Sequence, residues 1–351
     1  MVTIQELLAE ARQRGASDVH LSVGIPPKCR IHGVLEEMNG DRLMPEDTEK
    51  LIQPMLTQRT AETLMEKGEV DFSYSAPDLG RFRVNIFKQR GTYAAVLRLI
   101  NTEIPTPEQL GLPRSILGLT EKRRGLVLVT GPTGSGKSTS LASLMDIINE
   151  NHSQHCITLE DPIEYVHNHK RCIINQREVG LDTESFGNAL RVALREDPDV
   201  ILVGEMRDLE TIQIALEAAE TGHLVFSTLH TIGAAPTIDR VIDVFPPHQQ
   251  QQVRIQLAGV LEAVISQQLM PTIGGRGRTA AFEVMLATPA IKNLIREAKS
   301  HQIPSIIQTS KKQGMILMDD SIYELYLKRK ISIETALSYA QDPQMLEKKL
   351  Y

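Results

Sequence analysis

Residues 126–138 read LVLVTGPTGSGKS, an apolar run followed at once by a glycine-rich turn. The turn, from Gly131 to Ser138, fits the pattern G-x-x-x-x-G-K-[ST] in full, and a stretch with helical character continues to Asn149. In this pattern the glycines let backbone N–H groups turn inward around phosphate groups, and the lysine adds a positive charge. A strand before the turn and a helix after it are the context that this chemistry requires. The sequence therefore predicts a site for a nucleoside triphosphate.

The turn also predicts which residues touch the nucleotide. Lys137 supplies the positive charge, and the hydroxyl of Ser138 is a ligand for Mg²⁺ that is held through the nucleotide. We therefore expect ATP and Mg²⁺ as the cofactors. The residues of this segment predicted to hold the nucleotide are Thr133, Gly134, Ser135, Gly136, Lys137, Ser138 and Thr139.

Short apolar runs alternate with helical stretches beyond the turn. The apolar runs lie at 156–159, 172–175, 200–203 and 224–227, and the helical stretches between the later ones lie at 185–196 and 209–221. Runs that are apolar on both faces and alternate with helices are typical of a mostly parallel sheet with covered faces. A hairpin is expected from 263–269 and 279–285, and helices are expected after Thr288, where Pro289 stands at a first helical position.

The first hundred residues predict a separate, small α+β unit. A helix is expected over 3–14, another near 45–67, and strands at 19–23, 29–31, 70–74, 82–87 and 94–99. Prolines at 105, 107 and 113 then punctuate a stretch without periodicity, which is typical of a linker. We expect four parts: an N-terminal domain (1–100), a linker (101–113), an α/β core (114–288) and a helical C-terminal extension (289–351).

Composition excludes several classes of protein. With 41% apolar and 23% charged residues in a chain of 351, the usage is that of an ordinary globular protein. A net charge of −6 gives no general attraction to nucleic acid, and Arg276 and Arg278 lie in no basic or aromatic-rich stretch. No apolar run approaches the roughly 18 residues that span a bilayer, so direct membrane insertion is not expected.

A zinc site is not expected either. The cysteines, Cys29, Cys156 and Cys172, form no CxxC pair. No carboxylate or cysteine pattern organises the neighbouring histidines, which are His152, His155, His167 and His169.

Carboxylates follow two of the predicted strands. Ligands of open α/β sheets bind at the carboxyl ends of the strands, so these positions are candidates for catalysis. Glu205 follows one run after a single glycine, Gly204, and Glu160, Asp161 and Glu164 follow another. Such carboxylates can hold Mg²⁺, or they can orient or deprotonate an attacking water. The alternative for each is a solvated loop carboxylate.

Two histidines flank the run at 224–227. His230 follows the run and could respond to the phosphate state of a nucleotide, whereas His223 precedes it. For both, the alternative is a histidine with a structural role. Both are kept here as candidate catalytic residues.

Four arginines are candidate cations for the transferred phosphoryl group. Arg81 and Arg83 flank Phe82 in a predicted strand, so the period of two sends both to one face. Either they pair with nearby acids or they reach a nucleotide across a domain or subunit boundary. Arg195 and Arg207 are the other two candidates.

Taken in order, these motifs resemble those of the secretion ATPase superfamily and, within it, the type IV pilus retraction ATPases. The matching segments are GASDVHL (15–21), GIPP (24–27), RFRVN (81–85), the Walker A turn (131–138), ITLEDPIE (157–164), LREDPD (194–199), GEMRDLE (204–210) and GHLVFSTLHT (222–231). The segment AIKNLIRE (290–297) is similar to the C-terminal AIRNLIRE motif associated with retraction, with Lys292 in place of an arginine.

The resemblance implies a fold and a function. It implies a PAS-like N-terminal domain, a RecA-like P-loop ATPase core and a helical extension, assembled as a homohexamer. It also implies a cytoplasmic motor, peripheral to the inner membrane at the pilus base and docked on a platform protein there, that hydrolyses ATP to retract pili for twitching motility. In this family Arg83 would contact ATP and Glu205 would be the catalytic glutamate.

Two other functions stay open at this point. One is a pilus assembly or type II secretion motor of the same superfamily, although those relatives usually carry a larger N-terminal region and a tetracysteine zinc module. The other is an accessory paralogue that binds nucleotide, engages the same machine and hydrolyses ATP weakly.

Overall fold

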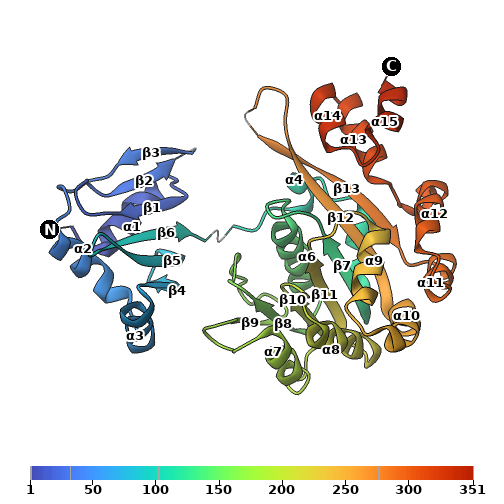
Figure 1. Ribbon diagram of the computed structural model, residues 1–351, viewed down its shortest axis with the longest axis horizontal. Coiled ribbons are helices and arrows are strands. Elements are labelled where there is room, and N and C mark those ends of the chain that lie inside the picture. The colour runs from blue at the N-terminus through green and yellow to red at the C-terminus, as the bar shows by residue number, and fades with distance from the viewer. Residues whose placement is uncertain (1, 32, 101–102, 276, 351) are drawn as a thin grey trace. The chain divides into compact units, whose positions relative to one another are not determined.

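A computed structural model describes residues 2–31, 33–100, 103–275 and 277–350 of the chain. The chain divides into two compact units, Met1–Glu103 with Glu164–Val166 and Ile104–Ile163 with His167–Tyr351 (Figure 1). The first two residues of the predicted linker, Asn101 and Thr102, and the loop residue Arg276 lie outside the described residues. Within the described part of the chain, every helix is too short or too polar to cross a membrane.

The first unit is built on an antiparallel sheet with the strand order β3-β2-β1-β6-β5-β4. Its elements are α1 (Ile4–Gln13), β1 (Asp18–Leu21), β2 (Lys28–Ile31), β3 (Val34–Glu37), α2 (Pro45–Ile52), η1 (Gln53–Met55), α3 (Gln58–Lys67), β4 (Glu69–Ala76), β5 (Gly80–Gln89) and β6 (Thr92–Leu99). The apolar face of α1, with Ile4, Leu7 and Leu8, is fully buried against this sheet. The predicted α+β character is confirmed.

Two elements of this unit differ from the sequence-based expectation. The single helix expected near 45–67 is two helices, because Pro54 has no N–H to donate an i→i−4 hydrogen bond; the chain continues as the short turn η1 and becomes extended at Leu56. Thr57 then caps α3 by accepting a hydrogen bond from the N–H of Thr60. The unexpected strand, β3, lies at the sheet edge with all four residues exposed, so no burial pattern marks it.

The second unit contains a seven-stranded sheet with the order β13-β12-β7-β11-β10-β8-β9. Its strands are β7 (Gly125–Thr130), β8 (His155–Glu160), β9 (Ile173–Glu178), β10 (Val200–Val203), β11 (Leu224–Leu229), β12 (Leu261–Pro271) and β13 (Arg278–Leu286). All neighbouring pairs are parallel except β12 and β13, which form the expected hairpin. The α/β fold class is confirmed.

Helices cover both faces of this sheet (Figure 1). They are α4 (Pro107–Leu110), α5 (Arg114–Leu117), α6 (Lys137–Asn151), α7 (Phe186–Ala193), α8 (Leu209–Glu220), α9 (Ala234–Asp243) and α10 (Pro247–Val260), with the short turn η2 (Gly118–Glu121). Leu126 and Leu128 of β7 pack with α7 to α10, whereas Val127 and Val129 pack with α5 and α6 on the other face. This alternation explains why β7 is apolar from Leu126 to Val129.

The C-terminal part is helical, as expected. It contains α11 (Pro289–Arg296), η3 (Ser300–Gln302), α12 (Ile303–Thr309), η4 (Lys311–Gln313), α13 (Met318–Leu327), α14 (Ile333–Tyr339) and α15 (Pro343–Leu350). The helices α13 to α15 share a small apolar core with Met270 and Ala281 of the β12–β13 hairpin. The division into four parts at residues 100, 113 and 288 remains our proposal.

Candidate functional site

The glycine-rich turn connects the buried strand β7 to helix α6. Its glycines have positive φ angles, 141° at Gly131, 78° at Gly134 and 90° at Gly136, which residues with a Cβ atom rarely adopt. Lys137 is buried, and its Nζ donates hydrogen bonds to the carbonyls of Gly131 at 2.8 Å and Pro132 at 3.1 Å. The ammonium group therefore lies over the turn, where phosphate oxygens can replace the two carbonyls as its partners.

Glu205 and His230 lie at the same edge of the sheet as this turn. Val203 at the end of β10 is in register with Ser227, and Leu229 at the end of β11 is in register with Thr130, the last residue before the turn. The loop after β10 is fixed by two hydrogen bonds, from the N–H of Gly204 to the carbonyl of Leu159 and from Thr228 Oγ1 to the carbonyl of Gly204. Rigid neighbours thus deliver Glu205 to the edge where the turn lies.

The Glu205 carboxylate has two cationic or potentially cationic neighbours. Its Oε1 is 2.8 Å from Nε of Arg207, and its Oε2 is 3.3 Å from Nε2 of His230. The side chain of Glu205 is only 18% exposed, whereas that of Arg207 is 70% exposed. The structure therefore brings three of the predicted catalytic residues into direct contact.

Glu160, at the end of β8, is held by two side chains that the sequence analysis did not identify. Its Oε1 accepts hydrogen bonds from Thr158 Oγ1 at 2.6 Å and from Gln176 Nε2 at 3.1 Å. Thr158 stands between apolar residues of β8, whereas Gln176 stands between Asn175 and Arg177 of β9, so only the register of the two strands reveals them. Asp161 follows in a cis peptide bond with Pro162.

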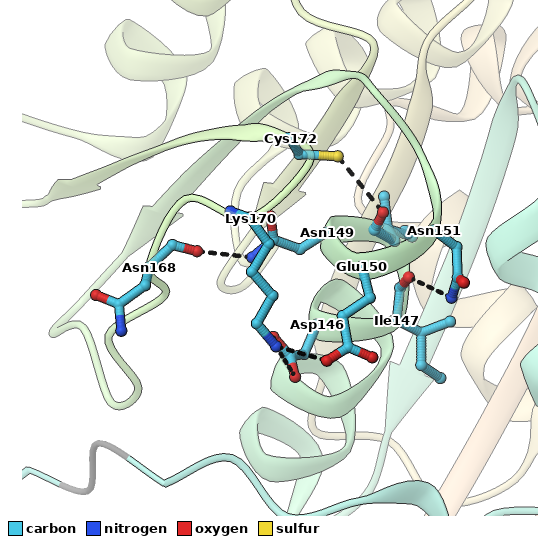
Figure 2. Close-up of polar contacts among 9 residues, drawn as sticks. Asp146, Ile147, Asn149, Glu150, Asn151, Asn168, Lys170 and Cys172 are labelled. Atoms are coloured by element: carbon cyan, nitrogen blue, oxygen red, sulfur yellow. Dashed lines mark hydrogen bonds and ion pairs between the residues drawn. The ribbon is translucent and has the colours of Figure 1, made fainter.

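The segment after Asp161 is fastened to α6, the helix that begins at Lys137 (Figure 2). Asn149 is fully buried, and its amide donates to the carbonyl of Asn168 at 2.7 Å and accepts from the N–H of Lys170 at 3.0 Å. The Nζ of Lys170 also lies 2.7 Å from Asp146 and 2.8 Å from Glu150. The C-terminal half of α6 thus holds the connection between β8 and β9.

Comparisons with known proteins agree with this geometry. A family model described as type II/IV secretion system protein matches residues 1–336. The chain belongs to this family. The type IV pilus retraction ATPase PilT of Pseudomonas aeruginosa is 51% identical over 97% of this chain and 99% of its own length. The type IV pilus ATPase PilU of the same organism is 42% identical over 96% of this chain and 88% of its own length.

A solved structure extends the similarity to the fold. The crystal structure of the pilus retraction motor PilT with bound ADP has a TM-score of 0.93 and 52% sequence identity, over 99% of this chain and all of that one. The resemblance that the motifs predicted is confirmed, and the chain is a nucleotide-binding P-loop ATPase of the secretion family.

Two candidate residues, His223 and Arg195, form no hydrogen bond or ion pair with the described residues Glu205, Arg207 and His230. His223 precedes β11, and its carbonyl accepts from Gly125 at the start of β7, so it lies at the amino edge of the sheet. Its Nδ1 is 2.9 Å from the carbonyl of Ala218. His223 therefore lies at the opposite end of β11 from His230, and a catalytic role for it stays a prediction. Arg195 is exposed after α7, and no hydrogen bond or ion pair joins its side chain to another described residue.

The remaining candidates, Arg81, Arg83 and Glu164, lie in the first unit. Arg83 lies on β5 of the first unit, where its Nη2 is 2.6 Å from Asp71 on β4, and Arg81 lies two residues before it. The nearby acid that the sequence left as an alternative is therefore present. Glu164 is exposed and groups with the first unit. Within the described residues, no three histidine, cysteine or acidic side chains gather in a way that would hold a metal ion.

Buried titratable groups lie next to the site. Glu283 on β13 accepts hydrogen bonds from the N–H groups of Ala234 at 2.7 Å and Met318 at 3.2 Å, which begin α9 and α13. Burial raises the pKa of Glu283 above its usual value, against the effect of these two hydrogen bonds. Burial also lowers the pKa of His167, which favours a neutral ring. Glu283 thereby fixes the helix that follows the His230 loop.

Proposed function

We propose that this chain is a motor that hydrolyses ATP to retract type IV pili. The observation that carries the proposal is the cluster of Glu205, Arg207 and His230 at the edge of the sheet where the phosphate turn lies. The extent of the similarity to PilT, which spans nearly all of both chains, supports the pilus as the site of work.

In the proposed mechanism, the turn and Lys137 hold the phosphates. The oxygen of a water molecule attacks the γ-phosphorus, the bond from that phosphorus to the bridging oxygen of ADP breaks, and a proton of the water passes to Glu205. His230, in contact with Glu205, orients this carboxylate. Mg²⁺ would neutralise phosphate charge, and the hydroxyl of Ser138 with the carboxylates of Glu160 and Asp161 provides the oxygen ligands that it prefers.

The arginines act on the developing negative charge. Arg207 is already beside Glu205, and its exposed guanidinium group can exchange this partner for a phosphate. Arg83 and Arg81 lie in the first unit and reach a nucleotide from a moving domain or a neighbouring subunit. This role favours a homohexameric ring, in which each nucleotide is enclosed by residues of two chains.

We further propose that the ring works on the cytoplasmic side of the inner membrane, against a platform protein at the pilus base. An accessory paralogue can share this position, because Pseudomonas aeruginosa carries both PilT and PilU. In a strain that lacks this chain, we expect pili that assemble but do not retract. Loss of pili altogether would overturn the proposal and identify an assembly motor.

A biochemical test separates the motor from the accessory paralogue. We expect the purified chain to release phosphate from ATP in a Mg²⁺-dependent reaction, with the Lys137→Ala variant as the blank. Turnover no higher than that of the blank would favour the accessory role instead.

A further inference from the structure

Gln267 lies behind the phosphate turn, on the strand next to β7. Ser266 of β12 is in register with Thr130, so Gln267 stands beside the first residue of the turn. It is buried, with 3% of its surface exposed. A buried amide requires hydrogen-bond partners, so the position of this side chain inside β12 calls for a physical explanation.

The explanation lies in the contacts of Gln267 with both ends of the turn. A Cβ atom at Gly131 would lie 2.2 Å from the backbone oxygen of Gln267, and one at Gly136 would lie 2.8 Å from its Nε2. Its Oε1 accepts a hydrogen bond from Ser140 Oγ at 2.8 Å, in the first turn of α6. Gln267 therefore rests against the first and last glycines of the turn and is bonded to the helix that follows.

We propose that Gln267 is the positioning residue of the phosphate turn. The inference rests on the ATPase activity and adds a residue that no motif includes. Ser140 lies three residues after Lys137, so the hydrogen bond to Gln267 fixes the first turn of α6 against β12. This fixes the direction of the backbone N–H groups that face the phosphates. Gln267 itself approaches the turn from behind and acts through it.

The neighbours of Gln267 on β12 face other parts of the molecule. Successive side chains of a strand point to opposite faces. Ser266 accepts a hydrogen bond from the N–H of Gly233 at 3.0 Å, and Gln268 donates one to the carbonyl of Tyr339 at 3.3 Å. Gln268 is therefore a matched control: the same residue type, on the same strand, also buried, with its partner in the C-terminal helices.

The test compares Gln267→Met with Gln268→Met. Methionine keeps the length of the side chain and removes the amide in both. We expect Gln267→Met to raise the KM for ATP about fivefold to tenfold, the effect of one unsatisfied buried hydrogen-bonding group, and to change kcat less. We expect Gln268→Met to lower the melting temperature about as much as Gln267→Met does. We expect it to leave the KM for ATP unchanged. Equal KM values for the two variants would overturn the proposal.

A second measurement isolates the contact with Ser140. In Ser140→Ala, the side-chain oxygen of Gln267 loses its hydrogen-bond donor. In the double variant, which combines Gln267→Met with Ser140→Ala, both side chains are apolar and no group is left unsatisfied. We expect the double variant to raise KM by clearly less than the product of the two single effects. A fully multiplicative effect would show that the two residues act independently, against the proposal. Dissociation constants for ADP, measured on all variants, keep this test valid even if the chain turns over no ATP and the proposed function fails.

Discussion

Replacing Glu205 with glutamine tests the assignment of the general base. The substitution keeps the shape of the side chain and removes its charge, so it deletes proton acceptance with little change in packing. A positioned general base contributes about 10²- to 10⁴-fold to the rate of a reaction and little to ground-state binding. We therefore expect Glu205→Gln to bind ATP with near-normal affinity and to turn it over slower by roughly that factor.

The structure predicts that this loss will not come from unfolding. Glu205 is paired with Arg207, whose side chain is 70% exposed, and an exposed ion pair contributes about 0.2–1 kcal/mol to stability. For a protein of this size, such a loss lowers the melting temperature by no more than about 4 °C. The turnover at 25 °C of the folded variant thus reports on chemistry.

The matched control is Glu160→Gln, since Glu160 ends the neighbouring strand and is held by hydroxyl and amide donors. The assay is steady-state phosphate release with ATP affinity measured beside it. For Glu160→Gln we expect the Mg²⁺ dependence to shift more than the turnover at saturating Mg²⁺. If Glu205→Gln hydrolyses ATP normally while Glu160→Gln is inactive, the base lies after β8 and the two roles are reversed.

Three further predictions concern other parts of the chain. Lys137→Ala should abolish nucleotide binding and keep the melting temperature within a few degrees, which titration with ADP and thermal unfolding would check; wild-type turnover would contradict the phosphate site. Substitution of Lys292 or Leu294 on α11 should preserve ATP turnover and impair pilus retraction, because this helix carries no group of the site; a matched loss of turnover would place α11 in the catalytic or ring-forming machinery. Because burial raises the pKa of Glu283 above 4.5, the folded chain binds a proton there before the unfolded chain does, so the free energy of unfolding should gain from this group as the pH falls through the raised pKa towards 4.5. In urea unfolding between pH 7 and 5, Glu283→Gln should gain less stability, or lose more, than the unsubstituted chain as the pH falls, and an identical pH dependence would contradict the assignment.

The fold of the second unit could be predicted because its strands are buried on both faces. Runs such as 200–203 are apolar at every position, and the structure has β10 over the same residues. One edge strand, β3, escaped prediction for the opposite reason. The side chains of β3 are exposed throughout, so no apolar pattern marks the strand, which pairs with β2 through the backbone and the ion pair of Lys28 with Glu37.

The geometry of the site could be predicted where one motif carries both geometry and chemistry. The glycine-rich turn is such a case, and the structure has its positive φ angles and its buried lysine. The sequence shows the histidines on either side of β11 alike, whereas a strand of six residues separates its two ends by about 20 Å, so only the structure distinguishes the position of His223 from that of His230. Gln267 was missed because its role arises from strand order: β12 follows β7 by more than 120 residues and pairs with it directly.

The arginines of the candidate site share a property that bears on the mechanism. Arg207 is paired with Glu205 and Arg83 with Asp71, and the two guanidinium-bearing side chains are 70% and 44% exposed. Pairs of this kind contribute little to stability, so their arginines can exchange a carboxylate for a phosphate at a small cost in free energy. Lys137, by contrast, is buried in the turn and has backbone carbonyls as partners. In the proposed mechanism, the lysine that holds the phosphates is therefore fixed in the turn, whereas the arginines proposed to act on the transition state are held by exposed ion pairs.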